Sequence, residues 1–302
     1  MGDNVSKNIV VAIAGPTAVG KTAIAIQVAQ MLGTDILSAD SRQIYHQLSI
    51  GTAKPSTDQL AQINHHLINT IDISQPYTAG DFERDALGVI RKIHDVNRHV
   101  VVVGGSGLYH KAVLQGFDDF PVTTTEDRDK WQQILRVDGI SALQNALRQR
   151  DPEYAGIVDL QNAHRLVRAL SVMDVSGQPF STFLNKAKSS RPFEIIRIFL
   201  NLEREVLYKR IDNRVDQMIE RGLVDEVTCL LPHRDLQALQ TVGYKEIFKF
   251  LDGEWSLDEA ISKIKQHSRN YAKRQVTWFR NQGLWTEVRV DLDLVLGLIL
   301  DS

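Results

Sequence analysis

Short apolar runs alternate with longer amphipathic stretches over the first third of the chain. Ile9–Ala14 is a continuous run of β-branched and small residues, and 35–39 and 99–103 are two further short apolar runs. Between them, 23–32 and 79–97 repeat their apolar positions at helical spacing. Continuous apolar runs are typical of strands that are buried on both faces, as in a parallel sheet with crossover helices. The pattern predicts an α/β fold built on a parallel sheet with flanking helices.

The alternation of strands and helices lapses between 117 and 191. Three stretches in this region have helical periodicity without strands between them, namely 126–135, 140–150 and 163–175. An apolar run at 194–202 then returns the chain to the sheet. We therefore expect a mainly helical insertion in the sheet domain. The expected organisation is a first part of the core over 1–116, the insertion over 117–191, and the completion of the core with basic C-terminal helices over 192–302.

The segment that joins the first apolar run to the first helix is GPTAVGKT, residues 15–22. It fits the P-loop pattern G-x-x-x-x-G-K-[ST] in the strand, loop and helix context that the motif requires. Lys21 adds a cation, and Thr22 offers a hydroxyl to Mg²⁺. Several loop N–H groups can point at one anion at the helix N-terminus. The predicted anion-binding residues are Gly15, Pro16, Thr17, Ala18, Val19, Gly20, Lys21 and Thr22. The ligand is a polyphosphate or pyrophosphate, and whether it is a nucleotide stays open.

Two of the predicted strands end in polar residues. The second ends at Asp40, which opens the segment DSRQIY, and the third ends in Gly-Gly-Ser-Gly with Ser106 in it. Because the carboxyl ends of parallel strands face the ligand crevice, we expect Asp40 and the hydroxyl of Ser106 beside the anion site. An alternative is that Asp40 only caps a following helix. P-loop kinases and ATPases usually carry a Mg²⁺-ordering aspartate at the end of such a strand, so its absence counts against both.

A loop and a histidine pair follow the DSRQIY segment. GTAKP at 51–55 places Lys54 in a loop, and His65–His66 precedes another apolar step. Adjacent residues of an extended segment point to opposite sides, which favours structural or substrate-contact roles over a metal pair.

Basic side chains recur at helical spacing in the second half of the chain. Arg165 and Arg168, with His164 beside them, share one helical face, for which a solvated basic face is the alternative. Arg210 and Arg214, four residues apart, also share one face. Between 261 and 286 there is no acid and there are six basic residues, Lys263, Lys265, Arg269, Lys273, Arg274 and Arg280. With aromatic residues between them, such a stripe is typical of a surface that meets nucleic-acid phosphates. A basic helix docked on an acidic part of the protein is the other possibility.

Composition narrows the class of protein. The 302 residues are 43% apolar, enough for a substantial core, and the net charge is −2. The single cysteine, Cys229, excludes an internal disulfide and a cysteine-based zinc site, and fits a reducing compartment. The short polar N-terminus leaves no room for a signal peptide, and no apolar run approaches membrane-spanning length. We expect a cytoplasmic protein that does not enter membranes, and nothing demands more than a monomer.

Taken together, the motifs resemble those of the bacterial tRNA dimethylallyltransferases, the IPP transferase family. The resemblance covers nearly the whole chain and rests on the order and spacing of GPTAVGKT, DSRQIY, GTAKP, GGSGLY, NAHRLVRAL, RVDQMIERGLVDEV, VGYKE and YAKRQVTWFR. It implies transfer of a dimethylallyl group from dimethylallyl diphosphate to an adenosine of tRNA. The acceptor is the exocyclic amine of the base directly 3′ of the anticodon, in tRNAs that read codons beginning with U.

The resemblance also implies roles for individual residues. Asp40 is the general base, and Ser106 stands where the family has an assisting threonine. Arg214 holds the diphosphate together with the P-loop and with Mg²⁺ near Thr22. The implied contacts with the tRNA anticodon stem-loop are Asp40, Ser41, Arg42, Gln43, Ser106, Arg128, His164, Arg165, Leu166, Val167, Arg168, Gln240, Thr241, Val242, Gly243, Tyr244 and Lys245. From the basic stripe, we add Lys273 and Arg274 to the expected tRNA contacts. A base stacked in that loop has to be flipped out to reach the carboxylate.

Two other activities remain open on the sequence. An adenylate isopentenyltransferase performs the same chemistry on free AMP or ATP, but has no use for the basic C-terminal helix and predicts a different insertion. A P-loop kinase for a small metabolite predicts an acid at the end of the third strand, where this chain has glycines. A binding protein without catalysis leaves the combination of Lys21, Asp40, Ser106 and Arg214 unexplained.

Overall fold

The computed structural model describes residues 7–184 and 190–300. The chain forms two compact units. The first, here called the core unit, combines Met1–Gln115 with Arg191–Ser302, and the second, the insertion unit, is Gly116–Ser190. These boundaries differ by one residue from the expected ones.

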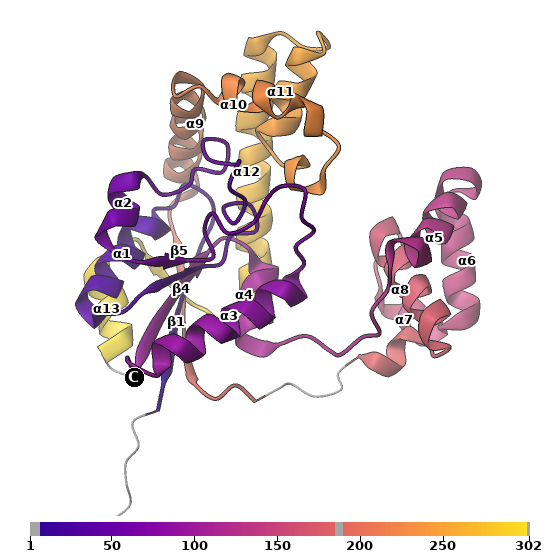
Figure 1. The fold of residues 1–302 in the computed structure, drawn as a ribbon, viewed down its shortest axis with the longest axis horizontal. Coiled ribbons are helices and arrows are strands. Elements are labelled where there is room, and N and C mark those ends of the chain that lie inside the picture. The colour runs from indigo at the N-terminus through magenta and orange to yellow at the C-terminus, as the bar shows by residue number, and fades with distance from the viewer. Residues whose placement is uncertain (1–6, 185–189, 301–302) are drawn as a thin grey trace, which may run out of the picture. The chain divides into compact units, whose positions relative to one another are not determined.

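A six-stranded parallel sheet organises the core unit (Figure 1). Its order is β3-β2-β4-β1-β5-β6. The strands are β1 (Ile9–Ala14), β2 (Ile36–Ser38), β3 (His65–His66), β4 (His99–Gly104), β5 (Glu194–Asn201) and β6 (Thr286–Arg289). Ala14 at the end of β1 is level with Gly104 at the end of β4. This register brings the loops that follow β1 and β4 together at the carboxyl edge of the sheet.

Helices of the core unit cover the sheet and extend beyond its carboxyl edge. The P-loop leads into α1 (Lys21–Leu32), and the glycine turn after β4 leads into α4 (Gly107–Gln115). The other helices are α2 (Thr57–Gln62), α3 (Ala79–His94), α9 (Arg204–Glu220), α10 (Leu223–Cys229), α11 (Tyr244–Leu251), α12 (Leu257–Asn281) and α13 (Leu292–Leu300). In Figure 1, α9 and α12 run alongside one another in the region of α10 and α11. They meet in a helix pair that lies close to the P-loop.

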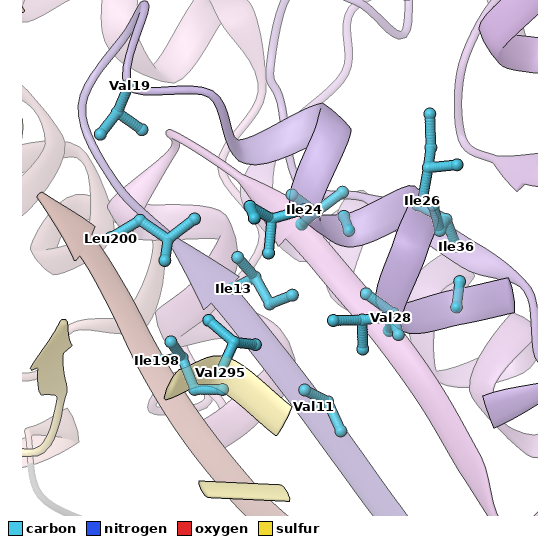
Figure 2. Packing of buried hydrophobic residues seen from close by; sticks show 14 of the residues in the cluster. Val11, Ile13, Val19, Ile24, Ile26, Val28, Ile36, Ile198, Leu200 and Val295 are labelled. Carbon is cyan, nitrogen blue, oxygen red and sulfur yellow. The ribbon is translucent and has the colours of Figure 1, made fainter. Parts of the chain in front are cut away.

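The main core lies between the central strands and the helices α1 and α13 (Figure 2). Val11 and Ile13 of β1 are fully buried, and Ile24 and Val28 of α1 pack against the same cluster. Val295 of α13 closes it. Burying each side chain of this kind contributes about 1.5–3 kcal/mol, so the strand before the P-loop and the helix after it are firmly joined.

A second cluster lies under the segment that follows β2. Ile44 and Leu48 pack with Val215 of α9 and with Tyr244 and Ile247 of α11. These contacts tie the DSRQIY segment to the C-terminal helices, although at least 160 residues of sequence separate the two.

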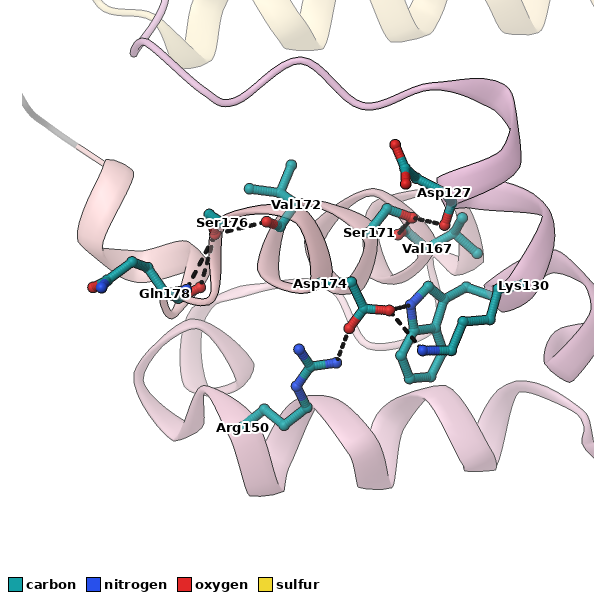
Figure 3. A network of polar contacts seen from close by, with 10 residues as sticks. Asp127, Lys130, Arg150, Val167, Ser171, Val172, Asp174, Ser176 and Gln178 are labelled. Atoms are coloured by element: carbon teal, nitrogen blue, oxygen red, sulfur yellow. Dashed lines mark hydrogen bonds and ion pairs between the residues drawn. The ribbon is translucent and has the colours of Figure 1, made fainter.

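Over its described residues, 116–184 and 190, the insertion unit is a bundle of four α-helices with its own core. The helices are α5 (Thr125–Asp138), α6 (Ile140–Arg150), α7 (Pro152–Ile157) and α8 (Ala163–Ser176), followed by a 3₁₀ turn, η1 (Phe180–Phe183). Asp174 of α8 accepts hydrogen bonds from Lys130 Nζ at 2.8 Å, from the Trp131 indole at 2.9 Å and from Arg150 at 2.6 Å (Figure 3). This carboxylate therefore joins three of the four helices.

The predicted α/β fold with a parallel sheet and a helical insertion is confirmed. The strands β3 and β6 were not predicted, because edge strands of two and four residues are too short to show a periodicity. The apolar run at 99–103 is consequently the fourth strand of the sheet in chain order. Over the two described stretches, no helix has both the length and the apolar character needed to cross a membrane.

Candidate active site

The P-loop folds as its glycines predict. Gly20 has a φ of 110° and Ala18 one of 63°, both in the left-handed region, and Lys21 opens α1 directly afterwards. The Lys21 ammonium donates to the carbonyl oxygens of Gly15 at 3.0 Å and Pro16 at 2.8 Å. Burial, together with the nearby Arg214 cation, lowers the pKa of Lys21 to about 7. An anion in the loop would meet this ammonium and the N–H groups of the first helical turn.

Asp40 serves the local backbone with one oxygen only. Its Oδ1 accepts from the N–H groups of Arg42 at 2.9 Å and Gln43 at 3.3 Å. The other oxygen, Oδ2, accepts no hydrogen bond from the residues that the structure describes. The alternative that Asp40 caps a helix is wrong, because residues 41–44 form a turn. The carboxylate closes this turn and keeps a free oxygen for chemistry.

The turn after β4 is held by several hydrogen bonds. Ser106 donates its N–H to Ala39 O at 3.2 Å, and its Oγ accepts the N–H of Ser41 at 3.0 Å. A Cβ atom at Gly104 would lie 2.0 Å from Ala39 O, so only glycine allows the two strand ends to approach this closely. His110 lies under the turn with Nε2 3.2 Å from Gly104 O, and burial lowers its pKa to about 4, so the neutral ring donates.

Ser106 differs from the expectation in one respect. The sequence predicted that its hydroxyl faces the crevice, but Ser106 is not among the residues that line the cavity, whereas Ser41 is. The hydroxyl is occupied by Ser41, because the close approach of β2 and β4 brings the two serines within 3.3 Å. Ser106 therefore acts on the Asp40 turn through Ser41.

A cavity of about 990 Å³ opens within the core unit at the carboxyl edge of the sheet. Lys21, Thr22, Asp40 and Arg214 all line it. Burial lowers the pKa of Arg214 to about 10, an effect that the Asp40 carboxylate partly offsets. The cavity thus brings together a cation from the P-loop, a cation from α9 and a carboxylate from the end of β2. The predicted placement of Asp40 in one crevice with the P-loop is confirmed.

The segment 240–245 forms part of the cavity wall with one exception. Gln240, Thr241, Val242, Gly243 and Lys245 line it, as do Arg42 and Gln43. Tyr244, which was grouped with the expected tRNA contacts, is fully buried and donates its hydroxyl to Glu226 at 2.7 Å. That assignment is wrong for the Tyr244 side chain, because a helix that begins at this residue turns it into the core.

Glu226 lies in the motif RVDQMIERGLVDEV, and the sequence indicated no role for it. Its carboxylate accepts the N–H groups of Ser49 at 3.1 Å, Ile50 at 2.7 Å and Gly51 at 3.0 Å. The side chain fixes the start of the GTAKP loop to α10. No local signal identifies this role, because the backbone N–H groups that it binds are 175 or more residues away in sequence.

The basic stripe on α12 divides into two groups. Lys265 pairs with Asp216 at 2.6 Å and Arg269 with Asp212 at 2.5 Å, both on α9. At these positions the alternative of a basic helix docked on acids is correct. Lys273 and Arg274 are exposed, and Arg274 also lines the cavity.

The predicted tRNA contacts of the insertion unit also divide. His164, Arg165 and Arg168 are exposed on α8, whereas Leu166 and Val167 are buried in the core of this unit. The side chains of Leu166 and Val167 therefore cannot contact tRNA at the surface, because a helix turns some of any five consecutive side chains toward the core of the unit. The Arg168 guanidinium lies 4.9 Å from the ring centre of Phe120. Elsewhere in the unit, Arg128 donates to Thr123 at 3.1 Å.

The two adjacent histidines point to opposite sides, as expected. His66 contacts Asp35 at 2.7 Å, while His65 lines the cavity. Among residues 7–184 and 190–300, no group of three or more His, Cys, Asp or Glu side chains is arranged to hold a metal ion.

The fold and the site define a P-loop protein whose anion-binding loop shares a cavity with a carboxylate. The family model described as IPP transferase matches residues 43–282. The chain belongs to the IPP transferase family.

Relatives span nearly the full length of the chain. A tRNA dimethylallyltransferase of Christiangramia forsetii is 49% identical over 90% of both chains, and one of Flavobacterium psychrophilum is 42% identical over 97% of this chain and 98% of its own. Among solved structures, the tRNA isopentenylpyrophosphate transferase of Bacillus halodurans is 38% identical with a TM-score of 0.71, covering 97% of this chain and 94% of that chain. A eukaryotic dimethylallyltransferase acting on tRNA is 28% identical with a TM-score of 0.78, covering 93% and 74%.

Proposed function

We propose that this protein transfers a dimethylallyl group from dimethylallyl diphosphate to tRNA. The acceptor is the exocyclic amine of the adenosine directly 3′ of the anticodon, in tRNAs that read codons beginning with U. The observation that carries the proposal is the shared cavity, into which the Lys21 ammonium and the Asp40 carboxylate both open. A relative 49% identical in sequence is named a tRNA dimethylallyltransferase.

The donor occupies the P-loop side of the cavity. A prenyl diphosphate carries a diphosphate without a base, so it needs no nucleotide pocket. As the bond from carbon to the diphosphate oxygen breaks, negative charge develops on the leaving group. Lys21, Arg214 and the N–H groups at the start of α1 are positioned to stabilise that charge.

A Mg²⁺ ion fits beside the same anion. The Thr22 side chain lines the cavity, while the described residues offer no carboxylate cluster for the metal. Mg²⁺ commonly takes few protein ligands and completes its shell with phosphate oxygens and water. Thr22 would hold the ion through the diphosphate, and the ion would neutralise charge on the leaving group.

The acceptor occupies the side of the cavity beside Asp40. An exocyclic amine is a weak nucleophile and has to lose a proton as its bond to carbon forms. Oδ2 of Asp40 takes this proton, because Oδ1 is occupied by the N–H groups of Arg42 and Gln43. The new bond joins nitrogen to carbon, and diphosphate leaves on the opposite side. Ser106 assists by holding Ser41, next to Asp40.

The tRNA contributes a base that leaves its stack, at a cost of about a few kcal/mol. The cavity volume of about 990 Å³ accommodates a base together with a five-carbon donor. Exposed cations are available for phosphates in both units: Lys273 and Arg274 in the core unit, and Arg165 and Arg168 in the insertion unit. We propose that the protein acts as a monomer in the cytoplasm, where tRNA is modified.

The test compares acceptors with one labelled donor. Labelled dimethylallyl diphosphate is incubated with the protein and, in parallel, unmodified tRNA, AMP or ATP. Only the tRNA should become labelled. Labelled AMP or ATP would identify an adenylate isopentenyltransferase, and an unlabelled tRNA would overturn the proposal.

A further inference from the structure

Gln275 on α12 has a buried amide with both ends bonded to backbone. Its side chain is 6% exposed. Oε1 accepts the N–H of Thr17 at 2.9 Å, and Nε2 donates to the carbonyl oxygen of Gly105 at 2.8 Å. Burying an amide without partners is costly, so this side chain is stable only in this arrangement. Its partners are 258 and 170 residues away in sequence.

The two loops that Gln275 joins carry the two halves of the site. Thr17 belongs to the P-loop, which contains Lys21. Gly105 directly precedes Ser106, whose hydroxyl accepts from Ser41 next to Asp40. A single amide therefore spans from the anion-binding loop to the turn that positions the carboxylate. A Cβ atom at position 105 would lie 2.3 Å from Nε2, so a glycine there makes room for the amide.

The helix that carries Gln275 is itself held in place. Two ion pairs, Lys265–Asp216 and Arg269–Asp212, fasten α12 to α9. Arg210 of α9 donates to Val19 O in the P-loop at 3.1 Å. The P-loop is thus tied at Thr17 to α12 and at Val19 to α9, and those two helices are tied to each other.

We propose that Gln275 is a positioning residue that sets the distance between the diphosphate and Asp40, the general base of the transfer reaction. The inference rests on the proposed function. Gln275 borders the cavity, but its amide is not available to bind substrate, because Oε1 and Nε2 are already hydrogen-bonded to Thr17 and Gly105. It acts by holding the P-loop and the Ser106 turn in register. A displacement of about 1 Å between reacting groups costs on the order of 10²-fold in rate.

Two variants break this connection from opposite sides. Gln275→Met keeps the shape of the side chain and removes both hydrogen bonds. Gly105→Ala keeps the glutamine but places a Cβ atom where its amide lies. The matched control is Gln266→Met, the same change at an exposed position of the same helix.

Four measurements are made on each full-length variant. They are the affinity for inorganic pyrophosphate by titration calorimetry, the single-turnover rate of transfer to tRNA at saturating donor, the dissociation constant for tRNA, and the melting temperature. We expect Gln275→Met and Gly105→Ala to lower the rate by roughly 10²-fold and to weaken pyrophosphate binding, with tRNA affinity within about twofold. The double variant should be no worse than the more impaired single variant, because both changes break one connection. Gln266→Met should match the unaltered protein.

Equal rates and equal pyrophosphate affinity in Gln275→Met and the unaltered protein would overturn the inference. So would a rate that recovers fully at a lower temperature at which the variant is folded, because a purely structural glutamine affects only the folded fraction. If the unaltered protein failed to label tRNA, the proposed function would fail, and pyrophosphate binding would still decide whether Gln275 orders the P-loop.

Discussion

At the residue scale, hydrogen bonds to the backbone hold Asp40 and Lys21 in place before a ligand binds. Asp40 closes its turn with Oδ1 and keeps Oδ2 available. The Lys21 ammonium donates hydrogen bonds to two carbonyl oxygens of its own loop, and a bound anion can take their place as acceptor. Both groups are therefore positioned before substrate binds, which lowers the cost of organising the transition state.

The role of Asp40 as base predicts the behaviour of Asp40→Asn. The asparagine keeps a side-chain oxygen for the N–H groups of Arg42 and Gln43 but cannot accept the proton. The single-turnover rate should fall by roughly 10²- to 10⁴-fold. The melting temperature and the tRNA affinity should change little. Rapid-quench measurement with labelled donor tests this, and an unchanged rate would remove Asp40 from the mechanism.

The lowered pKa of Lys21, about 7, predicts a pH dependence of donor binding. Below pH 7 the free ammonium is already charged, so binding an anion requires no proton. Above pH 7 the free lysine is neutral and binding has to take up a proton, so the association constant for pyrophosphate should fall by up to tenfold per pH unit. Lys21→Arg, which stays charged, should lack this added decline in calorimetry. Parallel profiles for the two proteins would contradict the assignment.

At the element scale, α9 and α12 form a pair whose charges have two different uses. Asp212 and Asp216 neutralise Arg269 and Lys265 along the contact between the helices. Lys273 and Arg274, nearer the end of α12, are exposed and have no acidic partner among the described residues. One helix thus uses some cations for packing and leaves others for a ligand.

This division predicts different salt dependences of tRNA binding. Lys273→Gln and Arg274→Gln should each reduce the slope of log affinity against log salt by roughly one, because each removes a phosphate contact. Lys265→Gln and Arg269→Gln should leave the slope unchanged and lower the free energy of unfolding by about 0–1 kcal/mol. Binding titrations from low to high salt, with thermal melts, distinguish them. An equal reduction of the slope by Lys265→Gln would show that its ion pair opens on binding.

At the scale of the whole molecule, the core unit and the insertion unit each have a hydrophobic core of their own. The insertion unit has its own cluster of buried side chains and its own polar network at Asp174. The cavity proposed to hold the diphosphate is lined entirely by residues of the core unit. Changes on the surface of the insertion unit should therefore leave donor binding intact.

Arg165→Gln tests this independence. It should weaken tRNA binding several-fold, since it removes an exposed cation from α8, and leave pyrophosphate affinity unchanged. Arg136→Gln, an exposed arginine on α5 outside the predicted contact surface, is the control and should leave both unchanged. A filter-binding assay and calorimetry measure the two affinities. Loss of pyrophosphate affinity in Arg165→Gln would mean that the units are coupled.

Interactions between neighbours in sequence were predictable from the chain alone. The P-loop is a continuous motif, and strands such as Ile9–Ala14 and helices such as Ala163–Ser176 carry their own periodicity. The sequence therefore determined the α/β core, the insertion and the conformation of the P-loop. The position of Asp40 followed from the rule that parallel strands present their carboxyl ends at one edge.

Interactions between distant segments were decided by the tertiary structure. Leu166, Val167 and Tyr244 were predicted to contact tRNA because they belong to contiguous motifs. Their side chains are buried, because a helix turns some side chains of any short segment toward the core. In the sequence, Lys265 and Arg269 belong to a basic stripe without acids. In the structure, α12 packs on α9, and Asp216 and Asp212 of α9 pair with these two cations. The proposed positioning role of Gln275 could not be predicted from the sequence. Folding brings Thr17 and Gly105 to the same amide, and hydrogen bonds depend on distances in space that the spacing in sequence does not give.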